Sequence, residues 1–521
     1  MYQLLLTGRY LTSKLMPLLA AIAVTLCTAM VLIVWSVMGG FLSSLLSQGR
    51  AFSGDVTVRW PGPGMAHYQD LAQRLLQDPA IAAAAPYIET LALASLPDNR
   101  LELVSLRGID PGQFQSVVQY EQSLWWKPAP EPLRKDKARL DFRLNPGLAE
   151  AFSAMRTDGL RLAEPDPVTG ELVPAVVPGI EMSGLSLRVP EGFYVPTRVR
   201  VPQPDGSSRT EDVFFPNRSI TLRVVPLDSN GRDVSFKSRT FPVANEFRTG
   251  VYELDKRIVF APFAELQSLL NMGPARQVTA GFDPFALDPD GAALAAVPTG
   301  ADTPARATGV IIRGAPGATP ELVRSRAIAA YARFAEHHNR LGPSVPTLLD
   351  MTGGGRPLIT TFEMDNAVLV GAVAKETVLV LGILVFISLT ASFLILAIFW
   401  AMVSEKTRDI GVLRSMGASG RGVAALWLAY GLGIGAVGSA AGGALAVAVI
   451  VNINAIHDVL AANNAAIWDP AVYYFSEIPS EVSPRRVAVV LGGGLLFAVL
   501  GALVPAVRAA RYHPVKALGF E

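Results

Sequence analysis

Charged side chains gather in one short segment, residues 404–418, which reads SEKTRDIGVLRSMGA and lies between two long apolar runs. If the segment is helical, Ile410, Leu413 and Met416 lie at positions i, i+3 and i+6 and can form an apolar stripe. Such a stripe, with charges beside it, can bind in a groove of another protein. These residue types therefore predict recognition of a partner protein. An ordinary loop that satisfies the positive-inside rule is the simpler alternative.

The motifs of several catalytic and metal-binding classes are absent from the sequence. G-x-x-x-x-G-K-(S/T) does not occur, which excludes ATP binding through a P-loop, and neither do C-x-x-C, H-E-x-x-H or G-x-S-x-G. None of the five histidines has the spacing of metal ligands. Cys27 is the only cysteine, so an intrachain disulfide is excluded. We expect a non-catalytic chain with no metal site and no cofactor of its own.

The composition predicts a membrane protein with a large water-soluble part. Half of the 521 residues are hydrophobic, 17% are charged, and the mean hydropathy is +0.35. The chain is therefore too apolar for a typical soluble enzyme and too polar for a polytopic carrier. The net charge of +1 gives no electrostatic reason to expect nucleic-acid binding.

Four apolar runs are long enough to cross about 30 Å of hydrocarbon, at roughly 20 residues each. They are residues 16–38, 377–400, 423–451 and 487–507. The first run has too long an apolar core for a signal peptide, whose core has about 7–15 residues, so we expect an uncleaved anchor. No ionisable residue lies in the central part of any run, which argues against an ion pathway through the membrane.

Lysine and arginine residues near the ends of these runs predict the orientation. Arg9 and Lys14 precede the first run, one basic group lies between the second and third runs, and another follows the fourth. Four spans place all three groups on one side, which is therefore predicted to be cytoplasmic together with both termini. Residues 42–370 and 454–484 are then extracytoplasmic. We expect a multi-pass protein of the inner (cytoplasmic) membrane.

The long region between the first two runs has the pattern of an α+β domain. Alternating residues predict strands, and helical spacing predicts a helix. The predicted strands cover 55–60, 89–96, 101–109, 195–201, 219–225 and 239–247, and the helix covers 68–77.

A further helix is predicted to begin at Thr319-Pro320-Glu321, which supplies an N-cap, a proline at the first helical position and an acid in the first turn. Its buried side should carry Leu322, Val323, Ile328, Tyr331, Ala332 and Phe334. Residues 283–307, rich in alanine, proline, glycine and aspartate, are predicted to be a surface loop or insertion.

Helical spacing continues outside two of the apolar runs. Phe41 and Leu45 extend the first run, and Met364 and Val368 extend the second run backwards, so we expect the two extensions to form a stalk. The third run has small residues at every fourth position, a spacing that lets membrane helices approach closely. These residues are Gly431, Gly435, Ser439 and Gly443.

Segment 404–418 resembles the cytoplasmic coupling segment of ABC-transporter permeases of the FtsX, MacB and LolC/LolE type, with the pattern EK-x-x-(D/E)-I-(G/A)-(I/V)-L-R-x-(L/M)-GA. Three further stretches resemble the lipoprotein-releasing LolC/LolE permeases. They are SVMGGF at 36–41, KSRTFPVANEFRTGVYELDKRIVFAPFAELQSLLNM at 237–272, and the end of the chain from residue 472. Taken alone, residues 250–253 indicate a tight turn before an edge strand.

Residue patterns and the resemblance together predict a membrane α-helical fold with four transmembrane helices and a large α+β extracytoplasmic domain between helices 1 and 2. The expected divisions are 1–48 for the first helix with its stalk extension, 49–362 for the domain, and 363–521 for an FtsX-like permease domain. The coupling segment is expected at 404–420. The proline-rich stretch 125–208 matches the family poorly, so its role is left open.

The resemblance also implies partners. ATP and Mg²⁺ would bind to a separate cytoplasmic ATPase dimer that contacts the coupling segment. The contact would involve Glu405, Lys406, Arg408, Asp409, Ile410, Gly411, Leu413, Arg414, Met416 and Gly417. A second permease, either another copy or a paralogue, would complete the membrane part. Membrane lipid and a periplasmic carrier or lipoprotein substrate are the other expected partners.

Lipoprotein release from the inner membrane, driven by mechanical transmission from the ATPase, is the function that the resemblance implies most directly. A MacB-like efflux permease is one alternative. An FtsX-like signalling protein that activates a cell-wall hydrolase is another. The sequence determines neither the substrate nor whether two identical or two different permeases pair.

Overall fold

A computed structural model describes residues 15–60, 64–132, 141–189, 192–202, 208–212, 218–226, 236–276, 302–341, 357–463, 465 and 477–512. These residues divide into two compact units. We call Leu45–Ala367 the sheet unit, and we call the described residues up to Ser44 and from Val368 onward the helical unit.

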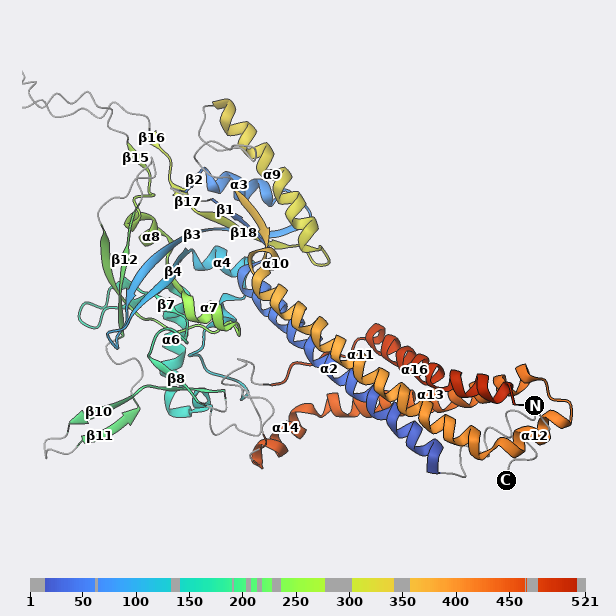
Figure 1. The fold of residues 1–521 in the computed structure, drawn as a ribbon. Coiled ribbons are helices and arrows are strands. Elements are labelled where there is room, and N and C mark those ends of the chain that lie inside the picture. Colours follow the sequence, from blue (N-terminus) through green and yellow to red (C-terminus); the bar gives the residue numbers. More distant parts are fainter. Residues whose placement is uncertain are drawn as a thin grey trace, which may run out of the picture. The chain divides into compact units, whose positions relative to one another are not determined.

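The sheet unit is built on a mixed sheet, which has nine strands in the described part of the chain (Figure 1). Seven strands follow one path: β19 (Leu358–Thr361), β1 (Val56–Arg59), β18 (Gly309–Gly314), β3 (Ile81–Ser95), β4 (Leu101–Ile109), β14 (Ile258–Pro262) and β7 (Val177–Pro178). A branch leaves the far half of β3, where β12 (Ser219–Val224) pairs with β3 and with β13 (Lys237–Pro242). The pairing of β4 with β14 is parallel, and the other pairings within this sheet are antiparallel.

Alternation along the strands divides the buried side chains between two cores. In β18, Val310 and Ile312 join a core with α3 (Tyr68–Leu75) and α9 (Pro320–Leu341), whereas Ile311 faces the other side. That second core holds side chains of α4 (Pro111–Val117) and α5 (Tyr120–Ser123). Helices therefore cover both faces of the sheet, and its central strands are apolar on both sides.

Short elements complete the sheet unit. The two-stranded pairs are β2 (Met65–Ala66) with β17 (Arg306–Ala307), β5 (Ala163–Pro165) with β6 (Leu172–Pro174), β8 (Ser186–Arg188) with β9 (Tyr194–Pro196), β10 (Arg198–Pro202) with β11 (Ser208–Asp212), and β15 (Ala275–Arg276) with β16 (Asp302–Thr303). The other helices are α6 (Ala149–Arg161), α7 (Tyr252–Arg257), α8 (Phe263–Leu269) and α10 (Phe362–Asp365), with 3-10 turns η2 (Phe142–Leu144) and η3 (Pro146–Leu148).

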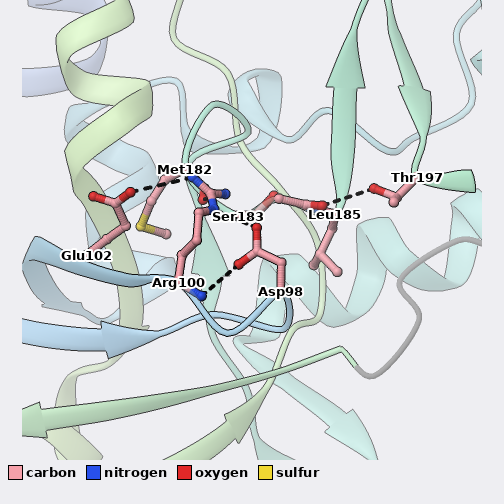
Figure 2. Close-up of polar contacts among 8 residues, drawn as sticks. Asp98, Arg100, Glu102, Met182, Ser183, Leu185 and Thr197 are labelled. Carbon is pink, nitrogen blue, oxygen red and sulfur yellow. Dashed lines mark hydrogen bonds and ion pairs between the residues drawn. The ribbon is translucent and has the colours of Figure 1, made fainter.

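The segment that carries β8 and β9 is held against the turn between β3 and β4 (Figure 2). Arg100 in that turn bonds Asp98 beside it and donates from Nη2 to the carbonyl oxygen of Met182 at 3.4 Å. On the segment itself, Ser183 Oγ accepts the Leu185 N–H, and Thr197 Oγ1 donates to the Gly184 carbonyl. Part of the proline-rich stretch is thus folded onto the sheet by polar contacts.

Several predicted elements are confirmed. The strands predicted at 55–60 and 101–109 are β1 and β4, and the helix predicted at Thr319-Pro320-Glu321 is α9. The strand predicted at 89–96 is the second half of a longer strand, β3, which turns back and pairs with β4.

Several sequence predictions in the sheet unit are wrong; the strand predicted at 239–247, for example, ends at Pro242 in β13. Leu322 is 43% exposed and Ala332 is also exposed, because the buried face of α9 is made by small residues such as Ala327 and Ala330 beside Tyr331. The strand after residues 250–253 is β14, which pairs on both sides and is therefore not an edge strand. Most of the loop predicted at 283–307 lies outside the described residues.

The helical unit contains four helices that are long and apolar enough to cross a bilayer, counted over the described residues. They are α2 (Leu15–Ser53), α11 (Ala367–Glu405), α13 (Gly420–Val451) and α16 (Pro484–Ala510). Each contains one of the four predicted apolar runs. The shorter helices α12 (Thr407–Ser415) and α14 (Ile453–Ala462) flank α13. A core of α2, α11, α13 and α16 side chains, including Phe399 and Ile434, joins the four long helices.

Candidate functional site: the α11–α12–α13 connection

The charged segment forms a short helix with a defined beginning and end. Helix α12 follows α11 directly, with Lys406 at its N-cap position. It ends at Ser415, and Gly417 then adopts a φ of +99°, a conformation that glycine reaches without steric cost. The Gly417 and Ala418 N–H groups donate to the carbonyls of Arg414 and Leu413, which satisfies the end of the helix. Ser419 Oγ accepts the Gly422 N–H and caps α13.

The inner face of α12 packs against its own chain. Ile410 is 3% exposed and lies in a small apolar cluster with Val403, Val423 and Ala509. Gly411 is buried beside it. Arg414 donates from Nη1 to the carbonyl oxygen of Ala510 at 2.7 Å, at the last residue of α16. The inner face therefore fixes α12 to the ends of α11, α13 and α16.

The burial of Ile410 corrects the expectation that it belongs to a stripe for a partner protein. Leu413 is half-buried, so of the three predicted stripe residues only Met416, at 80% exposed, is fully presented. Val412 is 44% exposed and lies four residues before Met416, on the same side of the helix. Val412 is not part of the predicted stripe, although its four-residue spacing from both Met416 and Arg408 places it on the same side of the helix.

The outer face of α12 is charged at one end and apolar at the other. We call this set the α12 outer face: Glu405, Arg408, Asp409, Val412 and Met416, all exposed. Lys406 Nζ lies 2.8 Å from Asp409 Oδ2 and is half-buried. Charges of both signs beside two apolar side chains form a surface that can bind a protein groove through ion pairs and apolar contact.

The small residues of α13 lie against α16. A Cβ atom at Gly431 would lie 2.5 Å from the Ala502 Cβ, and a Cβ atom at Gly435 would lie 2.8 Å from the Ala498 Cβ. At Gly443 the neighbour is Leu491, at 3.0 Å. Ser439 is 4% exposed, and its Oγ lies 2.6 Å from the position of a Cβ on Gly494 of α16. Larger side chains would therefore push these two helices apart.

The predicted stalk residues do not all lie on one continuous pair of helices. Helix α2 runs without interruption through Phe41 and Leu45, and Leu45 is 6% exposed. Met364 belongs to α10, whereas Val368 is the second residue of α11 and is 90% exposed. The two helices are separated at Asn366, whose side-chain amide donates to the Phe362 carbonyl at 2.9 Å. This local hydrogen bond competes with helix continuation.

Among the described residues, no group of three or more histidine, cysteine, aspartate or glutamate side chains could hold a metal ion. Cys27 Sγ lies 3.2 Å from Ser388 Oγ. His337 is exposed, whereas His338 bonds Asp70 through Nε2 at 2.8 Å, so the adjacent histidines face different surroundings.

The chain has been compared with known families and proteins. Residues 381–514, which include α12 and most of the helical unit, match the model of the FtsX-like permease C-terminal family. This part of the chain is therefore similar to the permease subunits of FtsX-type ABC transporters, a class of non-catalytic membrane proteins. The similarity and the four long apolar helices support a multi-pass protein of the inner membrane.

Within that class the chain is similar to the LolC and LolE proteins. It is 22% identical over 488 residues to the lipoprotein-releasing system transmembrane protein LolC of Xylella fastidiosa (strain Temecula1), a match that covers 93% of this chain and 89% of that protein. It is 23% identical to LolC of Neisseria meningitidis serogroup B, with coverage of 94% and 90%. It is 28% identical over 142 residues to LolE of Haemophilus influenzae, covering 27% and 32%.

Proposed function

We propose that the chain is the membrane subunit of a lipoprotein-releasing ABC transporter. The observation that carries the proposal is the length of the similarity to two proteins named as lipoprotein-releasing LolC, which extends through the sheet unit as well as the permease domain. The sheet unit is the part that would face the substrate. A match restricted to residues 381–514 would not separate release of lipoproteins from efflux or signalling.

ATP hydrolysis would take place on a separate partner. The α12 outer face combines charged and apolar side chains on a helix whose inner face is fixed to three long helices. An ATPase that holds this face would move α11, α13 and α16 when it closes on ATP and Mg²⁺. Helix α12 and both termini would lie in the cytoplasm, and the sheet unit would lie on the extracytoplasmic side of the membrane.

A second permease would pair with this chain, and lipid would surround the four long helices. The lipid-modified substrate would be passed from the membrane to a periplasmic carrier. In this mechanism the chain contributes no catalytic residue, because the work is done by movement of α2 and α11 that reaches the sheet unit.

Reconstitution tests the proposal. The chain would be purified with its co-purifying ATPase and any second permease, and placed in proteoliposomes that contain a triacylated lipoprotein. We expect ATP-dependent transfer of the lipoprotein to a soluble carrier. The control is the lipoprotein without its lipid-bearing cysteine, whose transfer to the carrier should not depend on ATP. Retention of the lipoprotein in the membrane while ATP is hydrolysed would contradict lipoprotein release.

A further inference from the structure

The end of α2 is surrounded by the sheet unit. Five consecutive residues, Gln48 to Phe52, each contact a different part of that unit, and we call their surroundings the α2 socket. The Gln48 side chain lies against Gly250, the Phe362 ring lies against Gly49, and Arg50 forms an ion pair with Glu363. The last two residues of the set have the most extensive contacts.

Phe52 anchors the helix in the core. It is 3% exposed and stacks on Phe247 with 5.3 Å between ring centroids and an angle of 16°. It also meets the edge of Phe260 at 5.5 Å. An aromatic side chain held in this way has little freedom to shift without disturbing the second core of the sheet.

The backbone at the end of α2 is also held. The Ala51 carbonyl accepts hydrogen bonds from the Gln119 N–H at 3.1 Å and from Arg313 Nη2 at 3.4 Å. Arg313 Nε donates to the Val117 carbonyl, at the end of α4, at 2.7 Å. A guanidinium group at two helix C-termini is favourable for both helix dipoles.

Asp255 organises the wall of the socket that faces Gln48. It is fully buried, and its Oδ1 accepts hydrogen bonds from the Thr249 N–H and from Thr249 Oγ1, both at 2.7 Å. Its Oδ2 accepts the Gly250 N–H at 3.3 Å. Gly250 has a φ of +85°, so the loop needs this support and this residue type. Hydrogen bonds to a buried carboxylate are among the stronger ones in proteins.

The chain connection behind the socket is short. After Ser53, only Gly54 and Asp55 precede strand β1, which pairs with β19 and β18. Asp55 donates its N–H to the Ile312 carbonyl at 2.9 Å and accepts the Gly314 N–H at 2.8 Å on its side chain. The helix is therefore joined to the sheet through two residues, of which Asp55 is itself hydrogen-bonded to β18.

We propose that Asp255 is a positioning residue, which holds the 248–251 loop as a wall of the α2 socket so that α2 and the sheet unit move as one body. The proposal rests on the proposed function, in which an ATPase moves the long helices, and it identifies where that motion enters the sheet unit. Residues 249, 250 and 255 thereby acquire a role beyond a local turn. A loosened wall would let α2 move within the socket, and ATP hydrolysis would then continue with little release.

The first test compares Asp255→Asn with Asp166→Asn in the reconstituted complex. Asp166 accepts two backbone N–H groups in the turn between β5 and β6, and among the described residues no hydrogen bond or ion pair joins it to α2 or to the loop, so it serves as the control. Lost hydrogen bonds to a buried carboxylate shift an equilibrium by about tenfold or more. We expect lipoprotein released per ATP hydrolysed to fall about tenfold in Asp255→Asn only, with ATP hydrolysis unchanged. Equal release in both variants would overturn the proposal.

The second test does not depend on how well Asp255→Asn folds. Gln48 and Gln122 line the same small cavity, and Gln122 is exposed. Cysteines at both positions, in a Cys27→Ser background, would be joined by a short bis-maleimide, with each single cysteine as a control. If α2 and the sheet unit move together, the cross-linked complex keeps its release per ATP within about twofold of the unlinked complex. Loss of release on cross-linking would show that α2 must move inside the socket.

Spin labels at residues 48 and 122 separate this inference from the proposed function. We expect the distance between the labels to be the same with and without ATP and vanadate, and its distribution to broaden in Asp255→Asn. If the distance between the labels changed with nucleotide, the end of α2 and its socket would not form a rigid body, and the inference would be rejected. A wild-type complex with a constant distance but no release would instead reject lipoprotein release.

Discussion

Glu246 is a fully buried carboxyl group in the sheet unit. It accepts hydrogen bonds from Ser183 and Ser186 on the segment that carries β8 and β9, and from Trp126 Nε1 at 2.7 Å. Burial raises the pKa of Glu246 to about 7, although these donors oppose the increase. The charge state of one side chain therefore affects how the segment that carries β8 and β9 is held against the sheet.

The stability of the sheet unit should depend on pH through Glu246. An unfolded glutamate has a pKa of about 4.3, so between that value and about 7 the folded protein binds a proton that the unfolded chain has lost. The stabilisation is complete below the unfolded value and is lost as pH rises through about 7. Thermal unfolding of the full chain, followed by tryptophan fluorescence, should show a Tm that decreases from pH 5 to 8. Glu246→Gln should remove most of this slope, and an unchanged slope would assign it to another group.

The α12 outer face makes a residue-level prediction about ATPase binding. Val412→Ala/Met416→Ala removes two exposed apolar side chains and leaves the inner face intact. Interface side chains that matter typically contribute about 1–2 kcal/mol, so we expect at least about tenfold weaker binding of the ATPase. Binding would be measured by titration of the detergent-purified permease. Ile456→Ala/Val459→Ala removes exposed apolar groups from α14 and should bind normally. Equal affinities for the two double variants would exclude the outer face as the contact.

At the scale of elements, the residue at which α11 begins determines where a proline can interrupt the motion that this helix would carry to the sheet unit. Proline costs about 3 kcal/mol or more in a helix interior but is tolerated in the first turn, where N–H groups have no helical partner. Because α11 begins at Ala367, Val368 lies in its first turn, although the sequence pattern places it within a longer helix.

Ala374→Pro should therefore uncouple the transporter, whereas Val368→Pro should not. Ala374 is exposed and lies in the interior of α11, so proline there breaks the helix without removing a buried side chain. We expect the Ala374→Pro complex to assemble and hydrolyse ATP with strongly reduced release of lipoprotein. Val368→Pro is the matched control and should release at nearly the wild-type rate. Normal release by Ala374→Pro would mean that α11 does not transmit the motion.

At the scale of the whole molecule, the positions of basic residues predict which parts face the cytoplasm. Arg408 in α12 and Arg421 in the first turn of α13 are exposed, whereas the sheet unit follows the first candidate span. In a Cys27→Ser background, cysteine at Ser238 should react with a membrane-impermeant thiol reagent in intact cells. Cysteine at Ser415 should react only after the cells are permeabilised. Both side chains are exposed, so labelling of Ser415→Cys in intact cells would reverse the orientation.

Local sequence patterns were sufficient to predict those features whose physical cause lies within a short segment of the chain. Membrane spans follow from the length and hydropathy of single segments, so all four predicted runs lie in long apolar helices. The beginning of α9 at Pro320 and the end of α12 before Gly417 follow from capping chemistry within a few residues. The family resemblance of segment 404–418 also required nothing beyond the order of its residues.

Long-range packing decided the features that these patterns did not show. Ile410 and Met416 are both apolar residues of one segment, yet contact with α11, α13 and α16 buries the first, whereas the second is left exposed. Asp255 belongs to a recognised motif, but only the fold brings its loop to the end of α2, about two hundred residues earlier in the chain. Side-chain spacing defines the faces of a helix or strand, and tertiary structure determines which face is covered.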